Sequence, residues 1–275
     1  MVPLPVLDLL VPGVYAWLQE PAIHGRPNAG VVVDEDGVTV IDTLMVASQW
    51  EPFAEAVEAL GVPIRRVVLS SSHVEFSGGT SRFRLAAVFG RAQASDHLDQ
   101  PADPAVFRRL HPAFATEFDD EVTTRPVTHI VEAPVQLTPA CAALPVTGEQ
   151  AENLVTLVPG AEIVFAGAMC AFGVTPLAHQ GDPAAWAGAL DEVAGMAPII
   201  VPGHGPIGGE EEVRALQGYL RACVEADGDA SRIPPGVWDG WPDREHDAVN
   251  VERAAMLARG EDAIPTTLLA RLGLT

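Results

Sequence analysis

Apolar and polar residues alternate along the first half of the chain in short runs that predict strands and helices in turn. Residues 30–33 and 38–41 are β-branched runs joined by a polar turn that ends in glycine, which predicts a β-hairpin. Residues 49–60 carry apolar side chains three and four positions apart and stop before Gly61, which predicts a helix. A further strand is expected over residues 64–69, and a serine-rich loop follows it directly.

The second half of the chain repeats this alternation. Short strands separated by turn residues are expected between residues 127 and 168. The longer elements expected here are a strand over 162–167, a helix over 184–196, a strand over 198–202, a strongly amphipathic helix over 210–225 and a helix near 251–259. Two sheet-rich halves, each followed by helices, indicate a one-domain α+β or α/β protein.

Two parts of the chain fit this pattern less well. After the serine-rich loop we expect a helix from about Thr80. Residues 93–124 are irregular, because Asp96 and Pro104 break the periodicity and only 105–114 fits a short helix. We interpret 93–124 as a surface insertion able to cover a pocket.

The composition is that of a folded and strongly acidic protein. Of the 275 residues, 48% are hydrophobic and 19% are charged, which excludes a disordered chain. The formal net charge is −21, and all 16 basic residues are arginine. Such a surface repels phosphate backbones and anionic lipid, so we expect a small-molecule substrate and neither nucleic acid nor membrane as a partner. The absence of lysine excludes a Schiff-base mechanism within this chain.

Cysteines and targeting signals add little chemistry. Cys141, Cys170 and Cys223 have no CxxC spacing, which argues against a disulfide framework and a structural zinc knot. The first residues lack a basic segment followed by an apolar core, and no run approaches the roughly 18–20 apolar residues of a transmembrane helix. We therefore expect a cytoplasmic protein.

Four segments, in order, resemble the metallo-β-lactamase superfamily over about residues 12–210. They are the hairpin 28–43, the strand and serine loop 67–79 at the place of the family's HxHxDH motif, the strand 163–168 at the place of its Gly-Asp ending, and the Pro-Gly-His-Gly turn 202–205. The resemblance implies an α+β fold, an αββα sandwich of two mixed β-sheets packed face to face with helices outside. It also implies a site on strand-end loops at one edge.

The resemblance also implies a domain division. Residues 1–210 would form the metallo-β-lactamase-like domain, with 93–124 as an insertion near the active-site edge. Residues 211–275 would form a C-terminal helical extension packed on the same domain.

The serine loop departs from the family's metal-binding pattern. Ser71 stands at the first histidine of HxHxDH, and His73 keeps the second. Glu75 replaces the aspartate, and Phe76 replaces the final histidine. A phenyl ring offers no lone pair, so this segment lacks ligands for a two-zinc centre.

The second half departs as well. The next family histidine corresponds to about Glu149, and the bridging aspartate corresponds to Ala168; only His204 is retained. Each zinc of such a centre needs three or more protein ligands. The sequence therefore predicts no metal cofactor, with one Zn²⁺, Mn²⁺ or Fe²⁺ ion shared by the four remaining polar groups as the alternative.

The same polar groups are the catalytic candidates. Carboxylates and imidazoles gathered in a partly apolar cleft suit general acid–base chemistry. These candidates are His73, Glu75, Glu149 and His204. Each also has a structural reading, such as a loop-bracing histidine or a helix-capping glutamate.

Six further positions are candidates for substrate binding. Cys170 follows Ala168 by two residues and would face the same side of a continuing strand. The others lie in or near the motifs above. The six are Ser71, Phe76, Ala168, Cys170, His179 and His24.

Three hypotheses follow for the function. The first is a metal-independent cyclase, lyase or isomerase of small-molecule, secondary metabolism that acts on an organic or acyl substrate. The second is a hydrolase of an ester, thioester or lactone that uses one atypically bound ion. The third is a non-catalytic, ligand-binding pseudo-enzyme; the fold alone does not choose among them.

Overall fold

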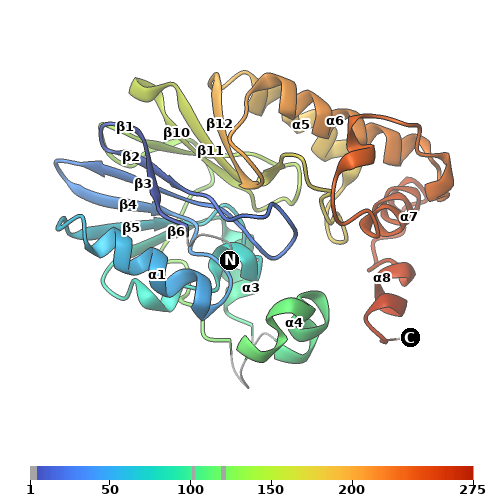
Figure 1. The fold of residues 1–275 in the computed structure, drawn as a ribbon, viewed down its shortest axis with the longest axis horizontal. Helices are drawn as coiled ribbons and strands as arrows, with labels where there is room; N and C mark the ends of the chain where they lie inside the picture. Colours follow the sequence, from blue (N-terminus) through green and yellow to red (C-terminus); the bar gives the residue numbers. More distant parts are fainter. Residues whose placement is uncertain (1–4, 101–102, 119–121, 275) are drawn as a thin grey trace.

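Two β-sheets lie face to face, and helices cover their outer faces (Figure 1). The computed structural model describes residues 5–100, 103–118 and 122–274. The strands of the first sheet lie in chain order: β1 (Leu7–Val11), β2 (Val14–Trp17), β3 (Ala29–Asp34), β4 (Gly37–Ile41), β5 (Ile64–Val68), β6 (Ala87–Gly90) and β7 (His129–Ile130). The strands of the second sheet lie in the order β12 (Ile199–His204), β11 (Ile163–Ala171), β10 (Leu154–Val158), β9 (Ala142–Pro145) and β8 (Val135–Gln136).

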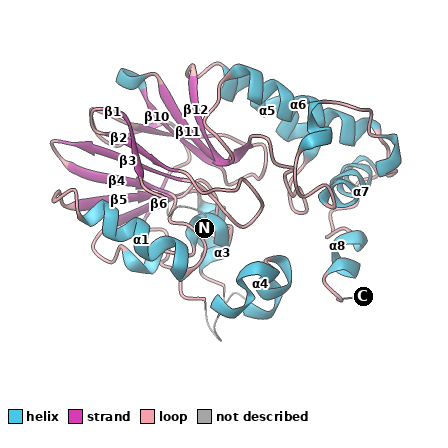
Figure 2. Cartoon of the chain, in the orientation of Figure 1, coloured by secondary structure: helices cyan, strands magenta, loops and turns pink. Residues whose placement is uncertain are grey.

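The helices alternate with the strands along the chain and are drawn in cyan in Figure 2. The α-helices of the described residues are α1 (Ala47–Glu58), α2 (Val74–Ser77), α3 (Ala92–Leu98), α4 (Pro104–Leu110), α5 (Pro183–Ala194), α6 (Glu210–Glu225), α7 (His246–Ala258) and α8 (Thr266–Arg271). The short 3₁₀ helices are η1 (Thr80–Arg82), η2 (Pro112–Glu117), η3 (Pro159–Ala161), η4 (Ala230–Arg232) and η5 (Val237–Gly240).

Both sheets are mixed, as the resemblance to the metallo-β-lactamase superfamily implies. Strands β1 to β4 pair antiparallel, and the predicted hairpin β3–β4 is confirmed. Strands β4 to β7 pair parallel, with α1 in the connection between β4 and β5. In the second sheet only β11 and β12 pair parallel. The predicted αββα sandwich is confirmed.

Three apolar clusters hold the layers together. One lies between the sheets and includes Ile41 and Phe165. The second joins the first sheet to α1 through Phe53. The third joins the second sheet to α5 and α6 through residues such as Trp186 and Leu220. Burying one such side chain stabilises a fold by about 2 kcal/mol, so these clusters account for the layering.

The segment after the serine loop differs from its prediction. The helix expected from about Thr80 is only the 3₁₀ turn η1, and the short helix α2 forms inside the loop instead. Gly78 and Gly79 allow this because their backbones pack closely against the segment between β4 and α1. A Cβ at Gly78 would lie 2.1 Å from the carbonyl oxygen of Met45, and one at Gly79 would lie 2.3 Å from that of Thr43.

The insertion and the chain's end meet beside the sandwich. Helix α4 ends at Leu110 rather than at 114, because Pro112 lacks the N–H that a continuing helix would need. Arg109 Nη1 of α4 donates to the carbonyl oxygen of Leu272, 2.8 Å away, just after α8. Residues 101–102 and 119–121 of the insertion lie outside the described residues. In the part of the chain that the structure describes, every helix is too short or too polar to span a membrane.

Candidate functional site

The serine loop after β5 is braced from within. Ser71 Oγ accepts a hydrogen bond from the His73 N–H at 3.2 Å and donates one to Glu152 Oε1 at 3.1 Å. The same Glu152 oxygen accepts from the Ser72 N–H. Ser71 is fully buried, so its role in the structure is to shape the turn that leads into α2.

Glu75, in the first turn of α2, lies between two histidines. Its Oε2 is 3.3 Å from His24 Nε2, and its Oε1 is 3.0 Å from His204 Nε2. The Gly25 N–H also donates to Oε1, at 2.7 Å. His204 comes from the end of β12, whereas His24 and Gly25 lie in the loop between β2 and β3. Three distant segments therefore meet at one carboxylate.

Burial and charge act against each other in this group. Burial alone would raise the pKa of Glu75, but His24 and His204 outweigh it and hold the pKa of that carboxyl well below its usual range. Burial likewise opposes the charged form of His24, yet the Glu75 carboxylate raises the pKa of His24 above its ordinary value. Glu75 and His24 therefore each favour the charged form of the other.

His111 completes this group from the other side. It follows α4 directly, and its ring stacks on that of His24 with centroids 4.8 Å apart. Burial lowers the pKa of His111 to about 3, so the imidazole is neutral. Its Nδ1 is buried and has no hydrogen-bond partner among the described residues. Gly25 leaves room for this ring, since a Cβ there would lie 3.2 Å from Nδ1.

Together these side chains form a set suited to a metal ion. One ligand atom each from His24, Glu75 and His111 lies within 4.8 Å of the other two. Two imidazoles and one carboxylate are a common ligand set for Zn²⁺ and Fe²⁺. The buried Nδ1 of His111 has no hydrogen-bond partner among the described residues, and a bound ion would give this nitrogen one.

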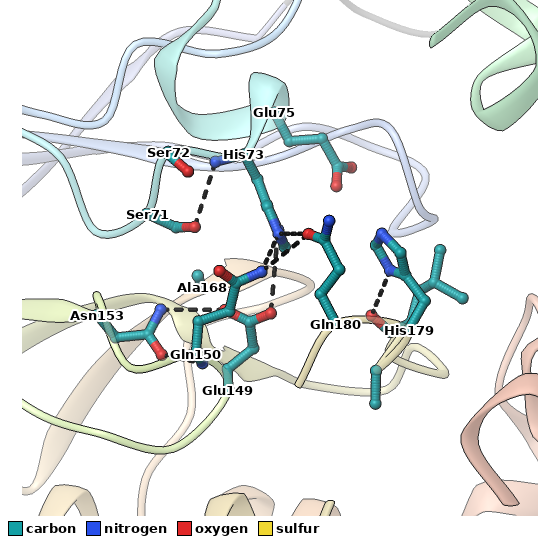
Figure 3. A network of polar contacts seen from close by, with 12 residues as sticks. Ser71, Ser72, His73, Glu75, Glu149, Gln150, Asn153, Ala168, His179 and Gln180 are labelled. Carbon is teal, nitrogen blue, oxygen red and sulfur yellow. Dashed lines mark hydrogen bonds and ion pairs between the residues drawn. The ribbon is translucent and has the colours of Figure 1, made fainter. Parts of the chain in front are cut away.

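His73 belongs to a second polar group, in which four side chains point toward one another (Figure 3). Its Nδ1 lies 3.9 Å from Glu149 Oε1, and its Nε2 lies 3.1 Å from Gln180 Oε1. Gln150 Nε2 contacts the same His73 nitrogen. Burial raises the pKa of Glu149, and the nearby His73 offsets this only in part. This group therefore pairs an imidazole with a carboxyl that takes up a proton more readily than usual.

The two polar groups share a small pocket of about 50 Å³. All four catalytic candidates, His73, Glu75, Glu149 and His204, line it. Phe76 lines it too, and its ring meets that of His204 edge-on with centroids 5.7 Å apart. The structure thus brings together the side chains that the sequence selected, but in two pairs rather than in one cluster.

A larger pocket of about 460 Å³ adjoins the small one and shares His24, His73, Glu75 and His179 with it. His111 lines the larger pocket, and much of the remaining lining is leucine and other apolar side chains from α4 and α8. Burial lowers the pKa of His179 to about 3, which keeps this ring neutral as well. The polar groups are therefore open to an apolar space.

The six candidates for substrate binding separate into two sets. His24, Phe76, Ala168 and His179 line one or both pockets. Ser71 and Cys170 line neither of them.

Cys170 does not share the orientation of Ala168 that strand alternation suggests. The pairing of β11 with β12 shifts register between Gly167 and Ala171, which breaks the alternation over this stretch. The Cys170 side chain packs in the apolar cluster with α5 and α6, where burial raises the pKa of its thiol.

Sequence reasoning missed several residues of the site. The most important is His111, which lies in the irregular stretch 93–124, and the sequence pattern identifies that stretch only as a surface insertion able to cover a pocket. His97 was also missed; its Nδ1 lies 2.7 Å from Glu152 Oε2. The one signal in the sequence was the residue type, since the chain has eight histidines. In the structure all of them are described, and every one except His129 lines a pocket or contacts a histidine that does.

No protein-family model matches the chain. Solved structures similar to it include the metallo-β-lactamase FIM-1 from Pseudomonas aeruginosa in its mono-zinc form, with 20% identity, 84% of this chain and 97% of that chain covered, and a TM-score of 0.60. The chain has the metallo-β-lactamase fold. The metallo-β-lactamase from Erythrobacter litoralis is 19% identical, with 79% and 96% of the two chains covered and a TM-score of 0.59. The metallo-β-lactamase from Hirschia baltica is 17% identical, with 78% of this chain and 97% of that chain covered and a TM-score of 0.58.

The prediction that the chain has no metal cofactor was wrong. The metallo-β-lactamase-fold structures similar to it include a mono-zinc form, and His24, Glu75 and His111 form a group able to hold an ion. The prediction failed because it counted ligands only at the family's motif positions, whereas two of these three residues lie outside them. The shared-ion alternative also grouped the residues differently, since only Glu75 of its four belongs to this set.

Proposed function

We propose that this metallo-β-lactamase-fold protein is a hydrolase of an ester, thioester or lactone with one divalent metal ion held by His24, Glu75 and His111. The observation that carries the proposal is the convergence of these three ligand atoms within 4.8 Å on the wall of the larger pocket. The ligand set fits one ion and not the two-zinc centre, because Ser71, Phe76 and Ala168 occupy ligand positions of that centre.

A divalent ion at such a site would supply a Lewis acid that activates water and polarises a carbonyl group. Of the protein's own residues, His204 donates to Glu75 Oε1 and so orients this carboxylate toward the pocket. Metal ligands commonly depend on such outer hydrogen bonds for their orientation.

His73 and Glu149 are the proposed proton carriers. Their side chains line the small pocket beside the metal group, 3.9 Å from each other. An imidazole next to a carboxyl of raised pKa can accept a proton and return it to a leaving group. Phe76 and Ala168 give this part of the site an apolar wall that restricts water.

A lyase or isomerase of small-molecule metabolism is the second candidate. The His73–Glu149 pair favours it, because moving a proton within a substrate needs such a pair and no attacking water. Product analysis separates the two functions. Hydrolysis adds the atoms of one water molecule to the products, whereas an isomer keeps the mass of the substrate and the products of a lyase together have that mass.

The test of the proposed function is a metal titration. Protein stripped with a chelator is titrated with Zn²⁺ and with Co²⁺, whose visible absorption reports its ligands. We expect one equivalent to bind, and we expect His111→Ala to weaken binding by about 100-fold or more because it removes one of three ligands. The same protein is then assayed against a panel of esters, thioesters and lactones.

The matched control is His129→Ala, which removes an exposed imidazole on β7 outside both pockets. This variant should bind metal like the wild type. Binding of less than about 0.1 equivalent, or equal affinity in the two alanine variants, would refute the metal site.

A further inference from the structure

The apolar part of the larger pocket is built by two helices that are far apart in the sequence. Helix α4 supplies Val106, Phe107 and Leu110, and α8 with the residue after it supplies Leu268, Leu269 and Leu272. The two helices lie near each other beside the sandwich in Figure 1. Their side chains face a cavity of about 460 Å³ that also reaches His24, Glu75 and His111.

Polar contacts hold these two walls in place. Arg109 Nη1 of α4 donates to the carbonyl oxygens of Leu272 and Gly273, at 2.8 and 3.2 Å. Glu252 of α7 accepts hydrogen bonds from the backbone N–H of Thr266 and of Thr267, at 3.0 and 2.8 Å. Helix α4 is therefore joined to the end of α8, and α8 is joined to α7, so the space between the two walls is part of the folded structure.

The charge of the lining restricts what can enter. None of the described residues that line this pocket is an arginine, and the chain has no lysine. Glu75 is its one acidic lining residue among those described. A ligand carboxylate or phosphate would find no Arg or Lys side chain in this lining, and His24, the lining imidazole with a raised pKa, already pairs with Glu75. The net charge of the chain, −21, disfavours an anionic ligand further. An uncharged hydrocarbon chain needs no cationic partner, so its binding is not weakened by this lining.

We infer that the larger pocket binds the straight, uncharged hydrocarbon chain of an acyl substrate between α4 and α8, with the carbonyl end toward Glu75. This inference rests on the proposed function, because it names the substrate class of the same hydrolase. A pocket lined mainly by apolar side chains with a few polar groups at one site is the usual form of a small-molecule site.

The experiment measures binding in the absence of turnover. With a chelator present, the uncharged fluorophore N-phenyl-1-naphthylamine is bound to the full-length protein and displaced by 1-alkanols from butanol to decanol. We expect the dissociation constant to fall by about fourfold for each added methylene group until the pocket is filled. We expect decanoate to bind more weakly than 1-decanol. Affinity that does not depend on chain length, or tighter binding of decanoate, would overturn the inference.

Two variants of Leu269 test whether the hydrocarbon chain of the alkanol binds in this pocket. Leu269→Asp puts a charge on the α8 wall and should weaken 1-decanol binding by about tenfold or more. Leu269→Trp keeps the wall apolar but narrows the space, so the gain per methylene group should stop at a shorter chain. The matched control is Leu85→Asp, at a leucine that is 97% exposed and outside the pocket, and it should bind like the wild type. Unchanged binding in both Leu269 variants would place the alkanols elsewhere and contradict the inference.

The two proposals fail separately. If the alkanol series behaves as expected but no metal binds, the apolar subsite stands and the metal-dependent hydrolase falls. If metal binds at His111 and a substrate of the panel is hydrolysed, but alkanol affinity does not follow chain length, the hydrolase stands and the substrate class is wrong.

Discussion

At the scale of single residues, Asp42 shows how a buried carboxyl connects the two halves of the site. It follows β4 with a φ of 59°, and both of its oxygens accept hydrogen bonds from Ser70, from the N–H and from Oγ, each at 2.7 Å. Ser70 Oγ in turn accepts from the N–H of Ala168 on β11, at 3.1 Å. Gly167 permits this approach, because a Cβ there would lie 2.2 Å from Ser70 Cβ.

Burial raises the pKa of Asp42 to about 7, and the hydrogen bonds from Ser70 lower it only in part. Between about pH 4 and pH 7 the folded protein therefore holds a proton that the unfolded chain has lost, so stability falls as the pH rises through this window. The amide side chain of the variant Asp42→Asn stays neutral, so the variant should not show this fall. The wild type should lose about 1.4 kcal/mol of its free energy of unfolding per unit of pKa shift.

The measurement for Asp42 is urea unfolding of both proteins at pH values from 4.5 to 7.5. The quantity of interest is the difference between their free energies of unfolding, which should move in favour of the variant as the pH rises. Asp96→Asn, at an exposed position, is the control and should keep the wild-type slope. A difference that is constant with pH would show that Asp42 is ionised throughout.

At the scale of elements, α8 is a helix that depends on its neighbours. It has six residues, too few for a stable isolated helix. Glu252 accepts from the N–H groups at its start, and Arg109 donates to the carbonyl oxygens at its end. The negative charge of Glu252 lies at the positive end of the helix dipole, and the positive charge of Arg109 lies at its negative end, so both stabilise the helix. The wall that α8 gives to the pocket is therefore stabilised from α7 and α4.

Replacing Glu252 with glutamine should loosen α8. The neutral amide keeps one acceptor oxygen where the carboxylate has two, and it loses the interaction with the dipole. We expect the backbone amides of α8 to exchange with solvent about tenfold faster, while the amides of α6 keep their rates. Hydrogen exchange followed by mass spectrometry measures this.

Glu261→Gln is the control for this variant, since Glu261 is exposed and pairs with Arg259 outside α8. Equal exchange rates of α8 in the wild type and in the Glu252 variant would contradict the dependence on Glu252.

At the scale of the whole molecule, Arg253 joins the chain's last helices to the site. It is a buried residue of α7, and its guanidinium donates to the carbonyl oxygens of Gln180, Gly181 and Ala263 and to Asp262 Oδ1, at 2.8–3.2 Å. Gln180 is also a partner of His73 and lines the larger pocket. One side chain therefore fixes both the segment before α8 and the loop that carries a site residue.

Arg253→Met keeps most of the side-chain volume but removes every donor. Three carbonyl oxygens then lose a partner, so we expect a loss of about 3 kcal/mol in the free energy of unfolding. Urea unfolding at pH 7 checks the value. In the control Arg259→Met, an exposed arginine that pairs with Glu261, the loss should stay below about 1 kcal/mol. Similar losses of unfolding free energy in the two variants would mean that the buried hydrogen bonds of Arg253 do not contribute to stability.

Part of the candidate site could be selected from the sequence because motif positions are local. His73, Glu75 and His204 were selected from short segments at strand ends, and Glu149 from its distance to a following strand. All four line one pocket. His111 carried no local signal, because its position in an irregular stretch says nothing about which ring it will stack on. Helix α8 escaped prediction for a similar reason, since residues outside it hold both of its ends.

The sequence by itself determined the main strands and helices of this protein, and the order of its motifs indicated their layering through the resemblance to the metallo-β-lactamase superfamily. Period-two and helical periodicity are properties of neighbouring residues, so they predicted the β3–β4 hairpin, the strands β5, β11 and β12, and the amphipathic helix α6. Only the tertiary structure decided the chemistry of the site. Whether Glu75 meets a phenyl ring, an imidazole or a metal ion depends on side chains from the β2–β3 loop and the end of α4. Their distances are set by how the whole chain packs, and no local pattern encodes them.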